Sequence, residues 1–303
     1  MQGLNLCGIF GASEMMGFSA AAPKSLAHCF SLRNSEHKPV QFQSFKYPPR
    51  RIISCKLESI GFEERMSPNE VKKEIGKCYE LIHRLGRGVV YLGSARMGPG
   101  HPHYTQAFEL GKEIATLLDC TSWSGAGSGL MDAVTKGALQ AGKAVGGFKI
   151  DKEAGEWTAT NFHSYLPSET YLTCRFFSAR KHGLVDAAVR SSSLDKTAVI
   201  GLPGGIGTLD EIFELMALIQ LDRIGSVLPV PFLLMNYDSF YSKLLDFLHE
   251  CENWGTLSKG EAASIWKVCN NNSEALSYLS EFYSDKSVDN CRKATPSDCE
   301  TAL

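Results

Sequence analysis

The chain has 303 residues, of which 44% are hydrophobic and 21% are charged, a composition that suits a protein with one buried core. Its formal net charge of −2, without a block of Lys or Arg, argues against a nucleic-acid-binding surface. No stretch of the sequence reaches the roughly 20 apolar residues that a membrane-spanning helix needs. The 10 cysteines include no C-x-x-C pair, so no zinc or thioredoxin motif is indicated, and we expect most of them to be reduced.

Residues 1–56 differ in composition from the rest of the chain. They are rich in Ser, Ala and Phe and contain only Glu14 and Glu36 as acids. The basic residues of this segment are Lys24, Arg33, Lys38, Lys46, Arg50, Arg51 and Lys56. This composition is typical of an organelle transit peptide, and a disordered cytosolic extension is the alternative. A secretory signal fits less well, because no basic residue precedes residues 4–10 and Glu14 interrupts the apolar stretch that follows.

The first ordered elements predict a βα unit. Ser67, Pro68 and Glu70 have the residue types expected at the start of a helix, which would end near Gly86. The apolar run 89–92 then predicts a buried strand, followed by the polar turn G-S-A-R at 93–96 and a helix over 104–118. Such units build a doubly wound parallel sheet, whose ligands bind beyond the carboxyl ends of the strands.

A second glycine-rich turn, S-G-A-G-S-G at 124–129, follows a weak strand at 120–124 and leads into a helix over 130–140. It lacks the G-x-G-x-x-G register of a dinucleotide fingerprint. Residues 145–150 predict a third strand, and 151–169 predict a long loop of the kind that forms a lid or a binding segment. We interpret His163, within this loop, as a surface or hydrogen-bonded residue and not as a catalyst.

The stretch 197–215, TAVIGLPGGIGTLDEIFEL, predicts a strand, a tight turn and a helix that begins at Thr208. Gly204, Gly205 and Gly207 would allow positive φ angles and leave no Cβ between the backbone and a ligand. Together with the positive end of the helix dipole, their N–H groups would bind an anion, and phosphate fits best. Glu211 stands three residues after Thr208, which also fits a capping box without any catalytic role.

The remaining elements complete an α/β domain. A helix that continues to Arg190 carries Arg180 and Lys181, and two adjacent cations in a helix usually indicate a solvent-exposed face. Residues 230–235 predict a strand in which Pro229 and Pro231 indicate a sheet edge or the strand's start. Beyond it we expect a helix over 239–250, a last strand over 264–269 and a helix over 273–282. The sequence therefore predicts a single Rossmann-like domain with a doubly wound parallel sheet over 57–284, and a flexible tail over 285–303.

The string P-G-G-x-G-T-x-x-E, from Pro203 to Glu211, resembles the signature of the LONELY GUY (LOG) family, long labelled "possible lysine decarboxylase". Members of that family are cytokinin riboside 5′-monophosphate phosphoribohydrolases. The G-S-A-R turn is similar to that of its longer members, the Arg180-Lys181 pair is similar to one that family members carry, and the resemblance extends over 89–282. The chain departs from the family at Ala126, where glycine is common, at Asp132, where Glu is frequent, and at Ala217, where Thr is frequent.

The resemblance implies that Glu211 and Arg180 are catalytic and that no metal or other cofactor is needed. The residues implied to contact substrate or phosphate are Lys181, Gly204, Gly205, Ile206, Gly207, Thr208, Asp210, Gly93, Ser94, Arg96 and Glu153. Glu153 is the first candidate for a carboxylate that follows the third strand, and Glu156 is the second. The alternative for Arg96 is a surface arginine paired with a carboxylate.

The implied reaction is hydrolysis of the N-glycosidic bond of a nucleoside 5′-monophosphate, in which Glu211 would stabilise the cation that develops at C1′. The resemblance also implies a homodimer and, because the family occurs in plants, a plastid location for the N-terminal signal, with the cytosol as the alternative. Two other functions stay open: a nucleotide-binding protein of the same fold without catalysis, and lysine decarboxylation. The second would need a lysine that carries pyridoxal phosphate, and no lysine stands in a recognisable setting for it.

Overall fold

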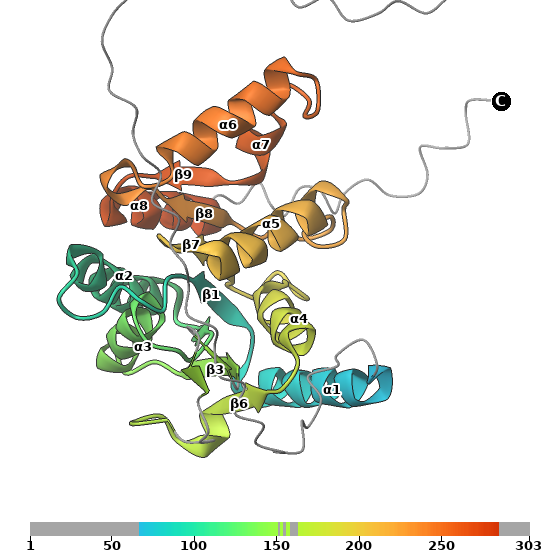
Figure 1. Ribbon diagram of the computed structural model, residues 1–303. Coiled ribbons are helices and arrows are strands. Elements are labelled where there is room, and N and C mark those ends of the chain that lie inside the picture. Colours follow the sequence, from blue (N-terminus) through green and yellow to red (C-terminus); the bar gives the residue numbers. More distant parts are fainter. Residues whose placement is uncertain (1–66, 151, 154–155, 158–162, 285–303) are drawn as a thin grey trace, which may run out of the picture. The chain divides into compact units, whose positions relative to one another are not determined.

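The computed structural model describes residues 67–284, except 151, 154–155 and 158–162. The expected N-terminal transit peptide and C-terminal tail lie outside the described residues. A seven-stranded parallel sheet with the order β6-β3-β2-β1-β7-β8-β9 runs through the described part (Figure 1). Its strands are β1 (Gly88–Leu92), β2 (Thr121–Ser124), β3 (Val145–Ile150), β6 (Tyr171–Cys174), β7 (Ala198–Gly201), β8 (Phe232–Met235) and β9 (Lys267–Cys269). The prediction of a doubly wound parallel α/β fold is confirmed.

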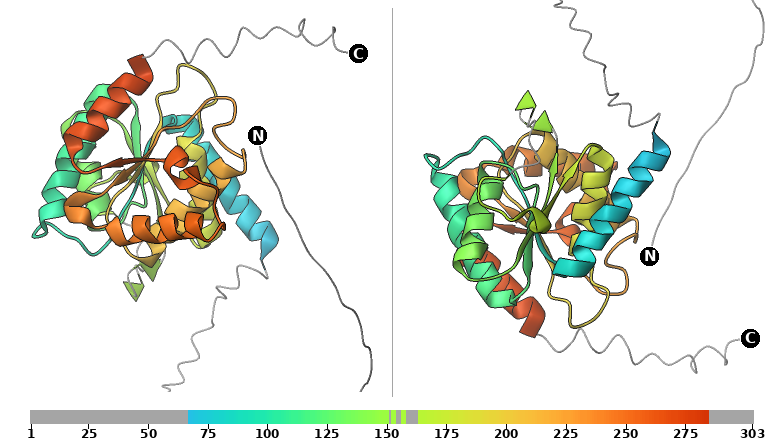
Figure 2. Two further views of the ribbon diagram at one scale, coloured as in Figure 1. Left: turned by 90° about the horizontal axis from the view of Figure 1, so that it is seen from above. Right: turned by 90° about the horizontal axis from the view of Figure 1, so that it is seen from below.

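Helices cover both faces of this sheet, as the two views along its edge show (Figure 2). One face packs against α1 (Pro68–Leu85), α4 (Phe177–Ala188), α5 (Ile206–Gln220), α6 (Ser242–Asn253) and α7 (Glu261–Ile265). The other face packs against α2 (Pro102–Leu118), α3 (Leu130–Gln140) and α8 (Asn272–Ser284). The central strand β1 shows why both faces are apolar, since Val89 and Tyr91 point into one core and Val90 and Leu92 into the other.

The order of the strands places a topological switch at β1. From β1 the chain proceeds outward through β2, β3 and β6 on one side, and then returns through α4 to β7 on the other side of β1. The loops that follow β1, β2 and β7 therefore meet at the carboxyl edge of the sheet, where doubly wound proteins bind their ligands.

The structure decides one open prediction and corrects two others. Pro229 and Pro231 indicated a sheet edge or the start of the strand, and the strand's start is confirmed, because β8 begins at Phe232, directly after Pro231, and pairs with both β7 and β9. Pro231 O accepts a hydrogen bond from Val199 N (2.9 Å). The expected strand over 264–269 begins only at Lys267, because α7 occupies residues 261–265. Helix α4 ends at Ala188, two residues before Arg190.

The predicted long loop between β3 and β6 contains short elements of its own. The strands β4 (Lys152–Glu153) and β5 (Glu156–Trp157) pair in antiparallel fashion, and a 3₁₀ turn spans Ser168–Thr170. His163 Nδ1 accepts the backbone N–H groups of Tyr165 (3.4 Å) and Leu166 (3.2 Å). These bonds confirm the interpretation of His163 as a hydrogen-bonded residue.

Two further features concern the described residues alone. No helix among them combines the length and apolar character needed to cross a membrane. The five cysteines that the structure describes are all free thiols, in agreement with the expectation of reduced cysteines.

A hydrogen-bonded cluster around Asp132 joins α2, α3 and the segment that leads to β6. The carboxylate accepts bonds from Tyr104 Oη (2.5 Å), Lys136 Nζ (2.8 Å) and Tyr165 Oη (2.7 Å). Burial raises the pKa of Asp132, but the three hydrogen bonds together lower it by more. The pKa therefore lies below its ordinary value. The ionised form is therefore the one that stabilises the fold.

We expect Asp132→Asn to reduce the free energy of unfolding at neutral pH by about 1–3 kcal/mol, because it removes a charged acceptor of three bonds. The stabilisation is complete above the ordinary aspartate pKa of about 3.9 and is lost as pH falls through the lowered value of the folded state. Denaturant unfolding at a series of pH values should therefore show the two proteins converge in acid. Asp119→Asn, at an exposed residue paired with Lys143, is the control and should change stability little. Equal losses of stability in the two variants would contradict the stabilising role of the ionised Asp132.

Candidate active site at the switch point

Three loops at the carboxyl edge of the sheet are held together by hydrogen bonds. In the loop after β1, Ser94 N donates a hydrogen bond to Pro203 O (3.0 Å) of the loop after β7. Ser94 O accepts a hydrogen bond from Leu130 N (2.8 Å) at the start of α3. Ser128 Oγ donates to Ala95 O (2.7 Å) from the loop after β2. These bonds make the G-S-A-R turn the shared support of the other two loops.

The loop after β7 forms a backbone cradle at the start of α5. A Cβ at Gly204 would lie 2.5 Å from Thr208 Cβ, so this position requires glycine for close packing. At Gly205 and Gly207 a Cβ would meet no described atom within 4 Å, which leaves the backbone open on that side. The expected positive φ angles are absent at all three glycines. The glycines therefore serve close approach, and the first N–H groups of α5 remain directed at the open side.

The capping-box interpretation of Glu211 is wrong. Helix α5 begins at Ile206, with Gly205 as the N-cap and without a side-chain capping bond, so Thr208 is the third helical residue and not the cap. Thr208 and Glu211 instead stand three residues apart on one buried face of α5.

Glu211 forms a buried ion pair with Arg180 of α4. Arg180 Nη1 lies 2.5 Å from Glu211 Oε1, and the two side chains are only 7% and 8% exposed. Arg180 Nε also donates to Phe148 O at the end of β3 (2.9 Å). A Cβ at Gly125 would stand 2.1 Å from Arg180 Nη2, so the glycine of the second turn leaves the space that the guanidinium occupies. The pair is thus fixed in position before any ligand arrives.

A cavity of about 410 Å³ lies between these loops, within the size range of small-molecule sites. Nine residues that the sequence predicted line it: Gly93, Ser94, Arg96, Arg180, Gly205, Ile206, Gly207, Thr208 and Glu211. Its walls also include Met131, Ile150 and Phe177, which sequence reasoning missed. In the sequence, only their places close to the glycine turns and to Arg180 could have indicated that these three residues line a cavity. Apolar residues within strands and helices usually belong to the hydrophobic core.

The charge of the cavity comes from Arg96 and from the start of α5. Arg96 is exposed, and none of the ion pairs found among the described residues involves it. The alternative interpretation, in which Arg96 is a surface arginine paired with a carboxylate, therefore gains no support. The Arg180–Glu211 pair contributes little net charge. The cavity is therefore suited to an anion.

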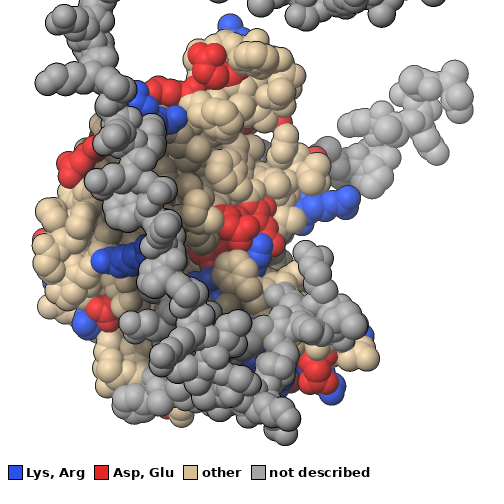
Figure 3. Space-filling model, viewed as in Figure 1, with Lys and Arg blue, Asp and Glu red and all other residues tan. Residues whose placement is uncertain are grey.

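Four predicted residues do not line the cavity. Lys181 pairs with Asp210 (3.0 Å) and Glu214 (3.1 Å) between α4 and α5, where the space-filling view shows acidic and basic atoms side by side (Figure 3). Burial lowers the pKa of Lys181, but bonds to these two carboxylates more than offset it and raise the pKa above its ordinary value. Gly204 packs beneath the cradle, and Glu153 belongs to β4, where its side chain lies outside the described residues.

Ala126, which stands where the LOG family commonly has glycine, has a strained backbone conformation. Ala126 has a φ of 49°, in the left-handed region that favours glycine, and its N–H donates to Ser124 Oγ (3.1 Å). A non-glycine residue costs roughly 1–2 kcal/mol there. The alanine therefore keeps the conformation that glycine would adopt, and its methyl group is buried beside Gly147.

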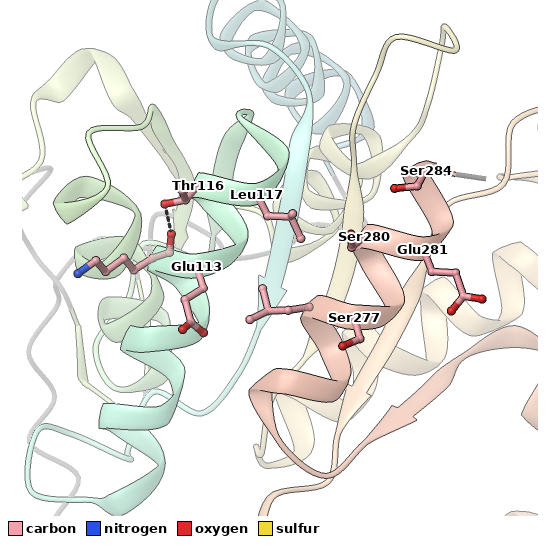
Figure 4. A pocket seen from close by; sticks show the side chains of 9 residues that line it. Glu113, Thr116, Leu117, Ser277, Ser280, Glu281 and Ser284 are labelled. Carbon is pink, nitrogen blue, oxygen red and sulfur yellow. Dashed lines mark hydrogen bonds between the residues drawn. The ribbon is translucent and has the colours of Figure 1, made fainter. Parts of the chain in front are cut away.

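A larger hollow lies elsewhere, between α2 and α8 (Figure 4). It measures about 780 Å³, and Thr116 Oγ1 there donates to a carbonyl of its own helix, Lys112 O (2.9 Å). Residues 116 and 117 lie in the last turn of α2, just before β2, so the hollow faces the edge of the sheet where strands begin, away from the cradle. Among the described residues, no group of three or more His, Cys, Asp or Glu side chains could hold a metal ion.

The fold and site define a Rossmann-like protein with a phosphate-type cradle and a buried carboxylate–guanidinium pair. Residues 131–279 match the family model described as "Possible lysine decarboxylase". This match and the names of the relatives confirm the resemblance of the P-G-G-x-G-T-x-x-E string, which lies within the matched residues, to the LOG family.

Several relatives have names of one kind. The chain is 30% identical over 168 residues to "Probable cytokinin riboside 5′-monophosphate phosphoribohydrolase LOGL6" of Oryza sativa subsp. japonica, which covers 55% of this chain and 60% of the relative. It is 29% identical over 175 residues to "Cytokinin riboside 5′-monophosphate phosphoribohydrolase LOG4" of Arabidopsis thaliana, and this match covers 58% of this chain and 73% of the relative. The chain thus spans less than two thirds of the length of the rice relative.

Among solved structures, the molybdenum cofactor binding protein from Rippkaea orientalis is similar at 17% identity and a TM-score of 0.41, covering 64% of this chain and 94% of that chain. A likeness of this degree carries no argument about function.

Two glycine substitutions separate packing from ligand access. Gly204→Ala should destabilise the fold by roughly 1–3 kcal/mol, because its Cβ meets Thr208 close to the backbone. Gly205→Ala should leave the melting temperature unchanged but weaken the binding of inorganic phosphate, because its methyl group enters the open side of the cradle. Thermal unfolding and calorimetric titration measure the two effects. Unaltered phosphate binding by the Gly205 variant would contradict the cradle assignment.

Proposed function

We propose that the protein hydrolyses the N-glycosidic bond of a nucleoside 5′-monophosphate, with a cytokinin riboside monophosphate as the substrate class, to release the free base and ribose 5-phosphate. The observation that carries the proposal is the placement of Glu211 in the wall of a cavity that also contains the backbone cradle. The names of the relatives support the substrate class.

The two parts of the cavity fit the two ends of such a substrate. The N–H groups at residues 205–208 and the guanidinium of Arg96 suit the 5′-phosphate. The apolar side chains of Met131, Ile150 and Phe177 line other parts of the cavity and suit an uncharged base. Phosphate binding would use interactions far from the scissile bond to position C1′.

Glu211 supplies the charge that the reaction needs. As the base departs with the bonding electrons, C1′ and the ring oxygen become cationic, and a fixed carboxylate stabilises that charge and orients the attacking water. Arg180 holds the carboxylate in one orientation through Nη1 while Phe148 O holds Arg180 through Nε. In this proposal Arg180 acts mainly on Glu211, and the phosphate is bound by the cradle.

One observation favours a second candidate, a nucleotide-binding protein without catalysis. The Glu211 carboxylate already forms a 2.5 Å ion pair with Arg180, and a carboxylate so engaged has less charge to offer a developing cation. Binding of a nucleoside monophosphate without release of base would support this candidate. Lysine decarboxylation gains no support, because none of the described residues that line the cavity is a lysine.

We also propose that the protein is a homodimer and that residues 1–56 direct it to plastids. The second proposal rests on the basic, acid-poor composition of that segment. A fluorescent protein fused behind residues 1–56 should accumulate in plastids. Uniform cytosolic fluorescence would favour the alternative of an extension without a targeting role.

Glu211→Gln should lower the rate of base release by about 10²–10⁴-fold while the protein stays folded and still binds phosphate. The amide keeps the shape of the side chain but removes its charge. Chromatography of the products from isopentenyladenosine monophosphate and from AMP measures the rate. Glu214→Gln, a change on the same helix outside the cavity, is the matched control and should retain the wild-type rate. A Glu211 variant with near-normal turnover would refute the role of this carboxylate.

A further inference from the structure

The start of α4 is held by a carboxylate from another helix. Phe176 is the N-cap residue of α4 and makes no side-chain capping bond. Glu74, on α1, accepts the backbone N–H of Arg175 at Oε1 (3.0 Å) and that of Phe176 at Oε2 (2.9 Å). In a capping box the bond to the N-cap N–H comes from a Glu or Gln at the third helical position, which is Ala179 here. Glu74 therefore supplies from α1 what α4 lacks, and its charge lies at the positive end of the α4 dipole.

Helix α1 makes a second bond to the same part of α4. Figures 1 and 2 show the two helices side by side. Cys78 stands one turn after Glu74 on α1, and its Sγ donates to Ala179 O (3.6 Å). Cys78, Leu81 and Ile82 are buried in the core, so α1 is itself fixed in place. Two residues on one side of a fixed helix thus hold the first turn of α4.

This first turn of α4 carries two residues that line the cavity, Phe177 and Arg180. Arg180 N donates to Phe176 O (3.2 Å), and Arg180 Nη1 donates to Glu211 Oε1 (2.5 Å). A chain of hydrogen bonds therefore leads from the Glu74 carboxylate through the peptide groups of Phe176 to Arg180, and from there to Glu211.

We propose that Glu74 is a positioning residue of the active site, which fixes the first turn of α4 and through it the orientation of the Arg180–Glu211 pair. Its effect on turnover rests on the proposed function. Glu74 precedes the residues 131–279 that match the family model, and it also precedes the range 89–282 that carries the resemblance. The proposal thus adds to the site a helix that the family match does not include.

The other end of α4 offers a matched comparison. Asp186, in the last turn of α4, accepts two bonds from Arg87 Nη2, one at each carboxylate oxygen (3.1 Å each). Neither residue lines the cavity. Asp186 follows Arg180 by six residues, or roughly 9 Å along the helix axis. A change at Asp186 should therefore weaken the attachment of α4 without displacing the Arg180 side chain.

Glu74→Gln tests the positioning role, because the amide keeps one accepting oxygen and turns an NH₂ group towards an N–H donor. We expect kcat for base release from isopentenyladenosine monophosphate to fall by about 10–100-fold, since misplacing a catalytic group by about 1 Å can cost that much. KM and the dissociation constant of inorganic phosphate should stay unchanged, because the cradle belongs to α5. Asp186→Asn, the matched control, should keep the wild-type kcat. Circular dichroism verifies that both variants fold, and calorimetric titration measures phosphate binding.

A second measurement does not depend on activity. The Nε–H of Arg180 donates to Phe148 O, and the side chain is only 7% exposed, so this proton should exchange slowly with solvent. Its NMR signal is identified by its loss in Arg180→Lys. Glu74→Gln should accelerate the exchange by at least about 5-fold, because it frees the turn that carries Arg180, and Asp186→Asn should leave it unchanged.

Each outcome decides for or against the positioning role. Wild-type kcat in Glu74→Gln would overturn it, and so would equal losses of kcat in the Glu74 and Asp186 variants, because general destabilisation would then explain both. Loss of phosphate binding together with kcat would also contradict it. If the wild-type chain releases no base from any nucleoside monophosphate, the proposed function fails and the exchange rates decide alone. Faster exchange in the Glu74 variant only would then support the positioning role, and any other pattern would overturn it.

Discussion

The buried ion pair between Arg180 and Glu211 connects the two halves of the sheet at the switch point. Arg180 belongs to α4, which packs over β1 and β3, and Glu211 belongs to the helix that follows β7. Removing one partner of such a pair leaves a buried charge without compensation, at a cost of about 3–5 kcal/mol. The surroundings are therefore built to keep the pair, through the carbonyl of Phe148 and the space left at Gly125.

This arrangement separates the tasks within the cavity. Because the guanidinium of Arg180 is engaged by a carboxylate, the attraction for an anion comes from the start of α5 and from Arg96. The cradle can then hold a phosphate while Glu211 faces a different part of the ligand. The G-S-A-R turn holds the cradle loop and the start of α3 together, since its backbone is bonded both to Pro203 and to Leu130.

Much of this could be predicted from the sequence, because glycine strings and apolar runs depend on local chemistry. The strand, the glycine turn and the helix around Gly204 follow from backbone sterics, and the parallel sheet follows from repeated βα units. The partners of Lys181 and Glu211 could not be predicted in the same way, since they depend on how α4 and α5 approach each other. The capping box was wrong because α5 begins at Ile206, two residues before Thr208. The prolines before β8 left a sheet edge or a strand start open, and only the pairing of β9 decides for the start.

The most direct measurement of the central claim is a product analysis of the wild-type full chain with matched pairs of a nucleoside and its 5′-monophosphate. If the cradle and Glu211 act on one ligand, each active monophosphate will yield free base and ribose 5-phosphate in equal amounts, and the nucleoside without phosphate will yield far less. Equal cleavage of both members of a pair would contradict a role for the cradle, and no cleavage of any monophosphate that binds would contradict hydrolysis at this site.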